Sequence, residues 1–160
     1  MSKAYDRVEW DFKQKVMIKM GFADIRVNLV MECVSTVSYS LLINGIPQEL
    51  FSPSKGIRQA DPLSPYLFII CSEFLNHSLN QAELQGLIYG IPTIRGGLHV
   101  THLLFADDSL VFCRSNPTEW NRLQQVLSKY EQVTGQRLNL DKTSIFFGNN
   151  TKLEVQETIL

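Results

Sequence analysis

The chain has 160 residues, 44% of them hydrophobic, which suits one globular domain with a single core. Fifteen basic and sixteen acidic residues give a net charge of −1, so the molecule as a whole has no field that would draw in a polyanion. The longest apolar run, Tyr66 to Cys71, is too short to cross a bilayer.

The N-terminal residues and the cysteines indicate an intracellular protein. Residues 1–6 contain no apolar stretch of the signal-peptide kind. Cys33, Cys71 and Cys113 are scattered and form no C-x-x-C pair, so neither a disulfide framework nor a zinc site is indicated. We therefore expect the protein inside the cell, in the nucleus or the cytoplasm, with no membrane partner.

The first third of the chain is predicted to form two helices and a hairpin. Asp24 is expected to cap a second helix that runs to about Thr36. Asn44-Gly45, between apolar residues 39–44 and 48–51, is a strong hairpin signal. The first helix ends at Gly21 and is predicted from apolar residues at every fourth position: Val8, Phe12, Val16 and Met20.

A third helix is expected after a loop at residues 52–56. Asp61-Pro62 and Ser64-Pro65 each offer an N-cap followed by an N1 proline, so the helix begins at one of them. Residues 66–75 are apolar almost all round, which indicates a buried helix. The glycine-rich stretch 86–97 is expected to be irregular.

The last part of the chain is predicted to hold a hairpin, a helix and a short strand. Two apolar runs, 101–106 and 110–113, are joined by Asp107-Asp108-Ser109, which predicts a tight hairpin with carboxylates at its tip. Residues 116–119 (Asn-Pro-Thr-Glu) are typical of an N-cap, an N1 proline and a capping-box glutamate, and Gly135 closes that helix. With a final strand at 144–147, the element order predicts an α+β domain whose helices pack on an antiparallel sheet.

Asp107 and Asp108 are the sharpest local feature. Adjacent carboxylates between apolar strands are unfavourable unless a positive charge lies among them. Magnesium is the expected partner, because it prefers oxygen ligands and keeps positions open for substrate phosphates. Taken alone, however, the Asp-Asp-Ser sequence is more simply explained as a polar turn.

The other charged and titratable residues give weaker signals. His77, His99 and His102 are interpreted as ordinary core or surface histidines. Basic residues crowd the start of the chain, where a solvated helix face is the favoured explanation and a phosphate-tracking surface is the alternative: Lys3, Arg7, Lys13, Lys15 and Lys19.

Four segments resemble reverse transcriptase motifs and occur in the family's order. Phe105-Ala106-Asp107-Asp108, preceded by His102-Leu103-Leu104, resembles the family's aromatic-x-Asp-Asp hairpin. Residues 55–65 (Lys-Gly-Ile-Arg-Gln-Ala-Asp-Pro-Leu-Ser-Pro) are similar to its glutamine-glycine and serine-proline segment, in the form found in LINE-type elements. Residues 2–8 resemble the tail of the first catalytic motif, and residues 135–144 resemble the segment that follows the hairpin.

The resemblance implies a piece of the polymerase palm of a LINE-type (non-LTR) retrotransposon, closest to plant elements. It implies a partial palm domain over residues 1–148, with residues 149–160 as a tail leading toward a primer grip and thumb. The family's first catalytic aspartate falls one position before Met1. We therefore expect the first catalytic strand, the fingers and the thumb to be missing from this chain.

The resemblance also implies roles for six residues. Asp107 and Asp108 are expected to be catalytic ligands of Mg²⁺, with Mn²⁺ as a substitute. Tyr5 is expected beneath the sugar of the incoming nucleotide, and Gln59 at the nucleotide or template. Ala60 stands where the family has glycine, and its effect depends on the local φ. Lys142 matches a lysine that protonates pyrophosphate, although a surface lysine is the more common reading.

The implied function is two-magnesium nucleotidyl transfer onto a primer 3′-hydroxyl, with this chain inactive alone. The partners would be an RNA template, a DNA primer, deoxynucleotide triphosphates and, in trans, a fingers or thumb polypeptide. One alternative is a non-catalytic remnant that binds nucleic acid or a partner protein. The other is a retroelement relic without function.

Overall fold

The computed structural model describes residues 5–93, 97 and 99–160. In this part the chain forms helices and short antiparallel hairpins, which confirms the α+β class. The α-helices are α1 (Trp10–Lys19), α2 (Asp24–Ser35), α3 (Ser64–Leu84), α4 (Pro117–Thr134) and α5 (Leu153–Ile159), and a 3₁₀ turn η1 covers Leu140–Lys142. The strands are β1 (Leu42–Ile43), β2 (Ile46–Pro47), β3 (Ile91–Pro92), β4 (His99–Val100), β5 (His102–Phe105) and β6 (Asp108–Val111).

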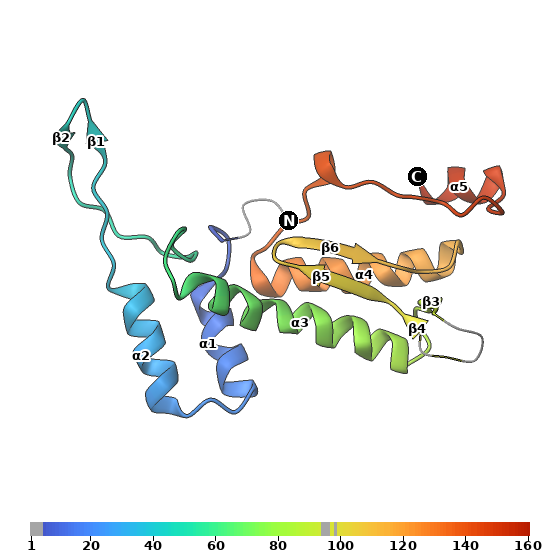
Figure 1. The fold of residues 1–160 in the computed structure, drawn as a ribbon, viewed down its shortest axis with the longest axis horizontal. Coiled ribbons are helices and arrows are strands. Elements are labelled where there is room, and N and C mark those ends of the chain that lie inside the picture. Colours follow the sequence, from blue (N-terminus) through green and yellow to red (C-terminus); the bar gives the residue numbers. More distant parts are fainter. Residues whose placement is uncertain (1–4, 94–96, 98) are drawn as a thin grey trace.

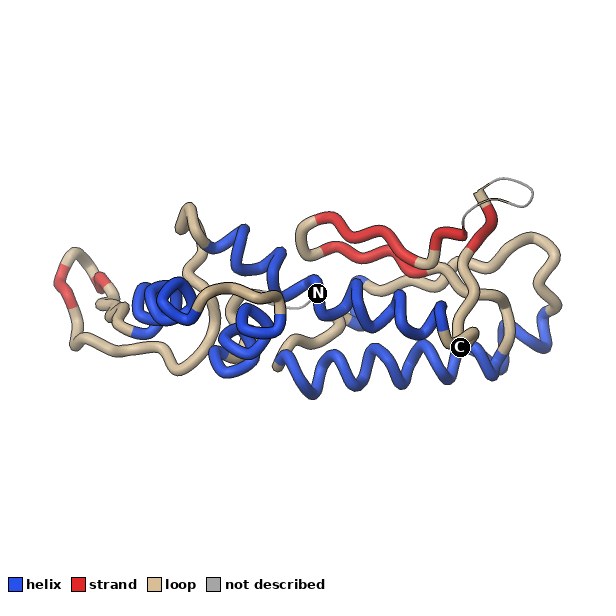
Figure 2. Tube along the Cα trace, turned by 90° about the horizontal axis from the view of Figure 1, so that it is seen from below, coloured by secondary structure: helices blue, strands red, loops and turns tan. Residues whose placement is uncertain are grey.

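Helix α3 is the axis of an elongated molecule (Figure 1). At one end α1 packs on α3 and α2 packs on α1, and the β1–β2 hairpin projects beyond them. Along the other half, α4 packs on α3, and the β5–β6 hairpin extends along these two helices in both views (Figures 1 and 2). No helix in the described ranges is long and apolar enough to span a membrane.

Two helix ends follow the predicted chemistry. Gly21 has φ +83, and the amide of Gly21 donates to the Ile18 carbonyl at 3.0 Å while that of Phe22 donates to Met17 at 3.1 Å. These bonds satisfy the last carbonyls of α1 in the Schellman pattern. At the start of α4, Asn116 Oδ1 accepts from the Thr118 amide at 2.8 Å, which confirms the N-cap.

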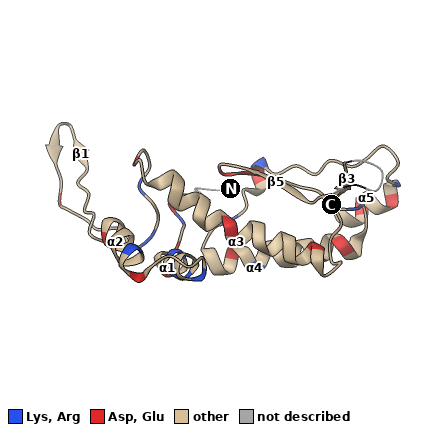
Figure 3. Cartoon of the chain, turned by 60° about the horizontal axis from the view of Figure 1, so that its bottom comes forward, with Lys and Arg blue, Asp and Glu red and all other residues tan. Residues whose placement is uncertain are grey.

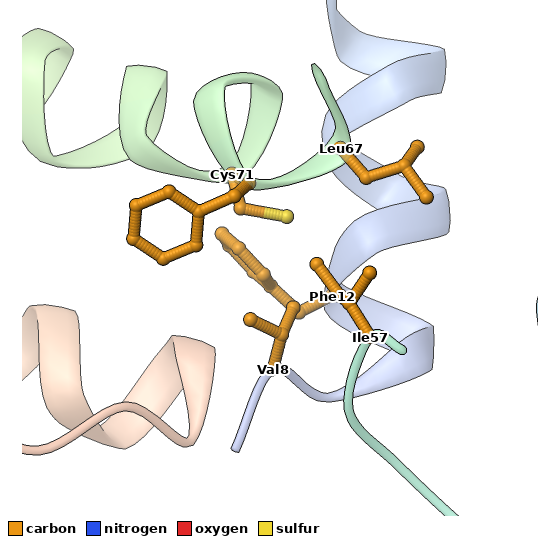
Figure 4. Packing of buried hydrophobic residues seen from close by; sticks show 6 residues of the cluster. Val8, Phe12, Ile57, Leu67 and Cys71 are labelled. Carbon is orange, nitrogen blue, oxygen red and sulfur yellow. The ribbon is translucent and has the colours of Figure 1, made fainter. Parts of the chain in front are cut away.

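Two buried clusters share α3. The first joins the start of the chain and the loop before α3 to the first turns of α3, as Figure 4 shows for Val8, Phe12, Ile57, Leu67 and Cys71. The second joins the later turns of α3 to α4: Leu75, Leu79, Ala82, Ile88, Leu123 and Tyr130. Phe74 packs against both clusters, so one helix supports both halves of the molecule.

Several predicted elements are wrong. Ala23, rather than Asp24, is the N-cap of α2. Helix α3 begins at Ser64 but is not buried all round, because its apolar outer face includes Tyr66 at 66% exposure. Residues 144–147 form no strand, whereas η1 and α5 were not predicted, and strands β3 and β4 occur in or beside the stretch expected to be irregular.

The expected antiparallel pairing is present, but within the described residues the strands do not join into one sheet. The strands form three separate two-stranded sheets, and a Tyr39–Phe51 bridge extends the first hairpin. The pairs are too short to make a common layer, so helix packing rather than a sheet supplies the core.

Candidate active site

The two adjacent carboxylates lie where the sequence predicts, at the tip of an antiparallel hairpin. Strands β5 and β6 pair with Phe105 opposite Asp108, so Ala106 and Asp107 form the two-residue turn. Ala106 has φ +50, a conformation that matches the first turn position of a primed hairpin turn. Asp107 is half-buried and Asp108 is exposed, so both can be reached from solvent.

One face of this hairpin is packed and the other is open. Leu104 and Val111 pack on the second buried cluster. The side chains that alternate with them point outward, and Phe105 is 84% exposed. Asp108 lies opposite Phe105 and therefore belongs to the outer face.

The loop before α3 is fastened to the start of the chain. The Gly56 amide donates to the Val8 carbonyl at 2.9 Å, and the Ile57 amide donates to the Tyr5 carbonyl at 2.7 Å. The Trp10 indole donates to the Gly56 carbonyl at 2.9 Å. Gly56 has φ +91, and a Cβ there would lie 2.9 Å from the Asp6 carbonyl oxygen, so glycine is required at this position.

These bonds bring together two residues that were predicted to share a nucleotide pocket. The Tyr5 ring stacks on Phe68 of α3, with ring centroids 5.0 Å apart. Gln59, in the loop tied to the Tyr5 segment, donates from Nε2 to Asp6 Oδ1 at 3.1 Å. In Figure 1 the tip of the β5–β6 hairpin points toward the half of α3 on which the Tyr5 segment packs.

Ala60 has φ +63, so the substitution for the family's glycine falls on a left-handed backbone position. An alanine is strained there, although its exposed position leaves room for the methyl group. The turn into α3 is fixed beside it: Asp61 Oδ1 accepts from the Leu63 amide at 2.8 Å, and the buried Ser64 hydroxyl donates to the Arg58 carbonyl.

A cleft of about 440 Å³ lies beside this loop. Gln59 and Asp6 line it together with Arg58 and the aromatic pair Tyr39 and Phe51. Lys142 belongs to η1, where it is exposed. Its predicted role in protonating pyrophosphate stays a prediction.

Of the basic cluster predicted at the start of the chain, Lys3 lies outside the described residues, and the other members do not form one solvated face. Figure 3 shows Lys and Arg on α1 and on the loop beside it. Lys15 and Lys19 are exposed, but Lys13 is fully buried, with its Nζ 3.5 Å from the Gly56 carbonyl oxygen. Burial lowers the pKa of Lys13 to about 8, although Cys71 opposes this shift, and burial raises the pKa of Cys71 to about 12.

The donor set at the hairpin tip suits a hard cation. Two carboxylates on adjacent residues offer oxygen ligands and remain open to solvent, as magnesium sites require. In the described part of the chain, no group of three or more His, Cys, Asp or Glu side chains is placed to hold a metal.

Three residues of this region were not identified from the sequence. Gly56 and Trp10 shape the loop through contacts with the backbone. The only sequence signal for Gly56 was a glycine after a lysine, which is weak. His102 was interpreted as ordinary, yet its ring bridges β5 and α3, with Nε2 2.9 Å from Asn76 Oδ1. Its place directly before the aspartate hairpin was the available clue.

A family model described as reverse transcriptase (RNA-dependent DNA polymerase) matches residues 1–157. The chain belongs to this family. It is 52% identical over 68 residues to an uncharacterized mitochondrial protein of Arabidopsis thaliana, a match covering 42% of this chain and 56% of that protein. It is also 28% identical over 145 residues to the retrovirus-related Pol polyprotein from a type-2 retrotransposable element of Drosophila melanogaster.

The second match covers 89% of this chain but only 13% of the fly protein. The chain thus spans about half the length of the plant relative and a small part of the Pol polyprotein.

Proposed function

We propose that the chain is the palm portion of a LINE-type reverse transcriptase and carries part of its two-magnesium nucleotidyl-transfer site. The observation that carries the proposal is the pair Asp107 and Asp108 at a hairpin tip in a chain of the reverse transcriptase family. A plain polar turn accounts for the turn alone, but not for its combination with the family match.

In this proposal the two aspartates hold Mg²⁺, or Mn²⁺ in its place, against the phosphates of a deoxynucleotide triphosphate. A metal ion held by these aspartates would supply the positive charge that activates a primer 3′-hydroxyl and stabilises the leaving pyrophosphate. The Tyr5 ring fills the space that a ribose 2′-hydroxyl would need, and Gln59 contacts the nucleotide or the RNA template. Lys142 donates a proton to pyrophosphate.

Metal binding by the isolated chain should be weak. Magnesium takes about six oxygen ligands in octahedral geometry, and two carboxylates of one turn leave most of that shell to water. We therefore propose millimolar-range binding and no useful catalysis by the chain alone, because phosphoryl transfer depends on precise positioning.

The test is a titration of the ¹⁵N-labelled chain with Mn²⁺, followed by NMR line broadening. We expect broadening centred on Asp107 and Asp108 and its reversal by excess Mg²⁺. Asp107→Asn should abolish it, whereas Asp141→Asn, at an exposed aspartate of η1, should leave it unchanged. Uniform broadening, or broadening insensitive to Asp107→Asn, would contradict the metal site.

The second candidate, a non-catalytic remnant that binds nucleic acid, is favoured by the cleft beside the loop. Arg58 offers a cation for phosphate there, and the Tyr39–Phe51 pair, with centroids 5.8 Å apart, offers rings for base stacking. Filter binding to an RNA–DNA hybrid at varied salt tests it, with Arg58→Gln as the variant expected to weaken binding. Binding that ignores both salt and this substitution would exclude it.

A further inference from the structure

His102 lies at the junction between the aspartate hairpin and α3. It is the first residue of β5, and the carbonyl of the residue before it, Thr101, accepts from the Phe112 amide at 2.8 Å. The His102 ring is half-buried between β5 and α3, with Nδ1 3.0 Å from the Thr101 hydroxyl and Nε2 2.9 Å from Asn76 Oδ1.

The partners of Asn76 determine which nitrogen of His102 carries the proton. Asn76 Nδ2 donates to Glu73 Oε2 at 2.8 Å, and a carboxylate can only accept, so the Asn76 amide cannot be flipped. Asn76 Oδ1 also accepts from Asn80 Nδ2 at 3.1 Å. The Asn76 oxygen therefore faces Nε2, which must carry a hydrogen, and in the neutral ring Nδ1 accepts from the Thr101 hydroxyl.

We infer that His102 is a positioning residue that fixes the Asp107–Asp108 hairpin to α3 through Asn76. Hydrogen bonds thus connect Glu73 and Asn76 on α3, through His102, to Thr101 at the base of the hairpin. The apolar contacts of Leu104 and Val111 hold the hairpin against the helices but do not set its position along them, whereas directional hydrogen bonds do. This inference rests on the proposed function for its catalytic consequence.

The geometry also makes the hairpin sensitive to acid. Burial lowers the pKa of His102, while Glu83 and Glu73 on α3 oppose that shift. The pKa of His102 in the folded protein lies below its ordinary value of 6.5. The stabilisation of the hairpin by neutral His102 is therefore complete above pH 6.5 and is lost as the pH falls from 6.5 toward the folded pKa.

The test is amide hydrogen exchange of the whole chain measured by NMR, with the Phe112 amide and the amides of β5 and β6 as readouts. His102→Leu should accelerate their exchange roughly tenfold, because Asn76 Oδ1 then keeps only its Asn80 donor and the directional link between α3 and the hairpin is gone. His102→Gln, which can donate to Asn76 but cannot titrate, should retain most of the protection and remove its pH dependence. His77→Gln, at an exposed histidine of α3, is the matched control and should change nothing.

If the leucine variant does not fold, the pH dependence of amide exchange in the unmodified chain still tests the inference. Protection of the Phe112 amide, corrected for intrinsic exchange, should fall as the pH drops below 6.5, in step with the His102 ring resonances. Unchanged exchange in His102→Leu, equal loss in the glutamine variant, or protection that ignores the ring titration would each overturn the inference. Absence of Mn²⁺ broadening at Asp107 and Asp108 in the same unmodified sample would instead overturn the proposed function.

Discussion

The burial of Lys13 opposes the stability of the fold. Its ammonium group is buried, and its hydrogen bond to the Gly56 carbonyl is long, at 3.5 Å. The Trp10 indole already donates to the same oxygen at 2.9 Å, so the carbonyl keeps a donor without Lys13. A folded pKa of about 8 against 10.5 indicates an unfavourable charge up to about pH 8.

Lys13→Met should therefore raise the free energy of unfolding at pH 7 by up to about 3 kcal/mol. The gain should shrink as the pH rises from about 8 toward 10.5, because the lysine in the folded protein then loses its proton. Urea unfolding of both chains at pH 7 and pH 10 measures the difference. Lys15→Met, at an exposed position of α1, should have little effect. A Lys13→Met chain less stable than the parent at pH 7 would contradict this account.

Two alanines lie in left-handed backbone conformations at the candidate site. Ala106 at the hairpin tip has φ +50, and Ala60 before α3 has φ +63. Replacing either by glycine relieves about 1–2 kcal/mol of backbone strain but adds about 0.5–1 kcal/mol of chain entropy to the unfolded state. Each variant should gain roughly 0.5–1 kcal/mol in thermal or urea unfolding, whereas Ala82→Gly inside α3 should lose about 1 kcal/mol. A loss in both turn variants would show that these turns relax in solution.

At the scale of elements, the sequence pattern placed Glu119 correctly in the first turn of α4 but implied the wrong hydrogen-bond partner for its carboxylate. The signal predicted a capping-box glutamate reaching back to Asn116. The buried carboxylate instead accepts from the Tyr89 amide at 2.6 Å and the Arg114 amide at 3.1 Å, which ties two other segments to α4.

Glu119→Ala should therefore lower the free energy of unfolding by roughly 2–3 kcal/mol, since it leaves two backbone donors without their acceptor. Asn116→Ala removes only the helix cap and should lower it by about 1 kcal/mol. Chemical unfolding of the two variants measures this order directly. Equal effects would mean that water replaces the carboxylate at both amides.

Sequence patterns of a few neighbouring residues correctly predicted those features of the fold that depend on local backbone conformation. The helix stop at Gly21, the Asn44-Gly45 turn and the aspartate hairpin depend on backbone conformations that a few neighbouring residues specify. The strand at 144–147 failed because short apolar runs need a pairing partner, which no sequence pattern identifies. The links from Gly56 to Val8 and from His102 to Asn76 join residues far apart in the chain and could not be predicted.

At the scale of the whole molecule, α3 connects the two parts of the candidate site, which pack on different turns of this helix. The start of the chain with Tyr5 and the loop with Gln59 pack at its first turns, and the aspartate hairpin packs at its later turns. Because one helix spans both, the distance between the proposed nucleotide pocket and the proposed metal ligands depends on the docking of each segment on α3. Substitutions at the docking contacts should therefore affect catalysis more than their distance from the aspartates suggests.

The last prediction concerns polymerisation itself. On a primed RNA template with Mg²⁺, the chain alone should incorporate no nucleotide, because Asp107 and Asp108 of a single hairpin cannot position two metal ions. The chain aligns with 13% of the fly Pol polyprotein, so that protein with its matching segment replaced by residues 1–157 supplies the remaining structure. We expect primer extension by the polyprotein that carries residues 1–157, measured in the same gel assay as the parent polyprotein, and loss of this extension on Asp107→Asn.

The inserted segment must still dock its hairpin correctly, so His102→Leu should reduce extension while His77→Gln should not. Robust extension by the isolated chain would overturn this account, since other groups would then have to hold the metals.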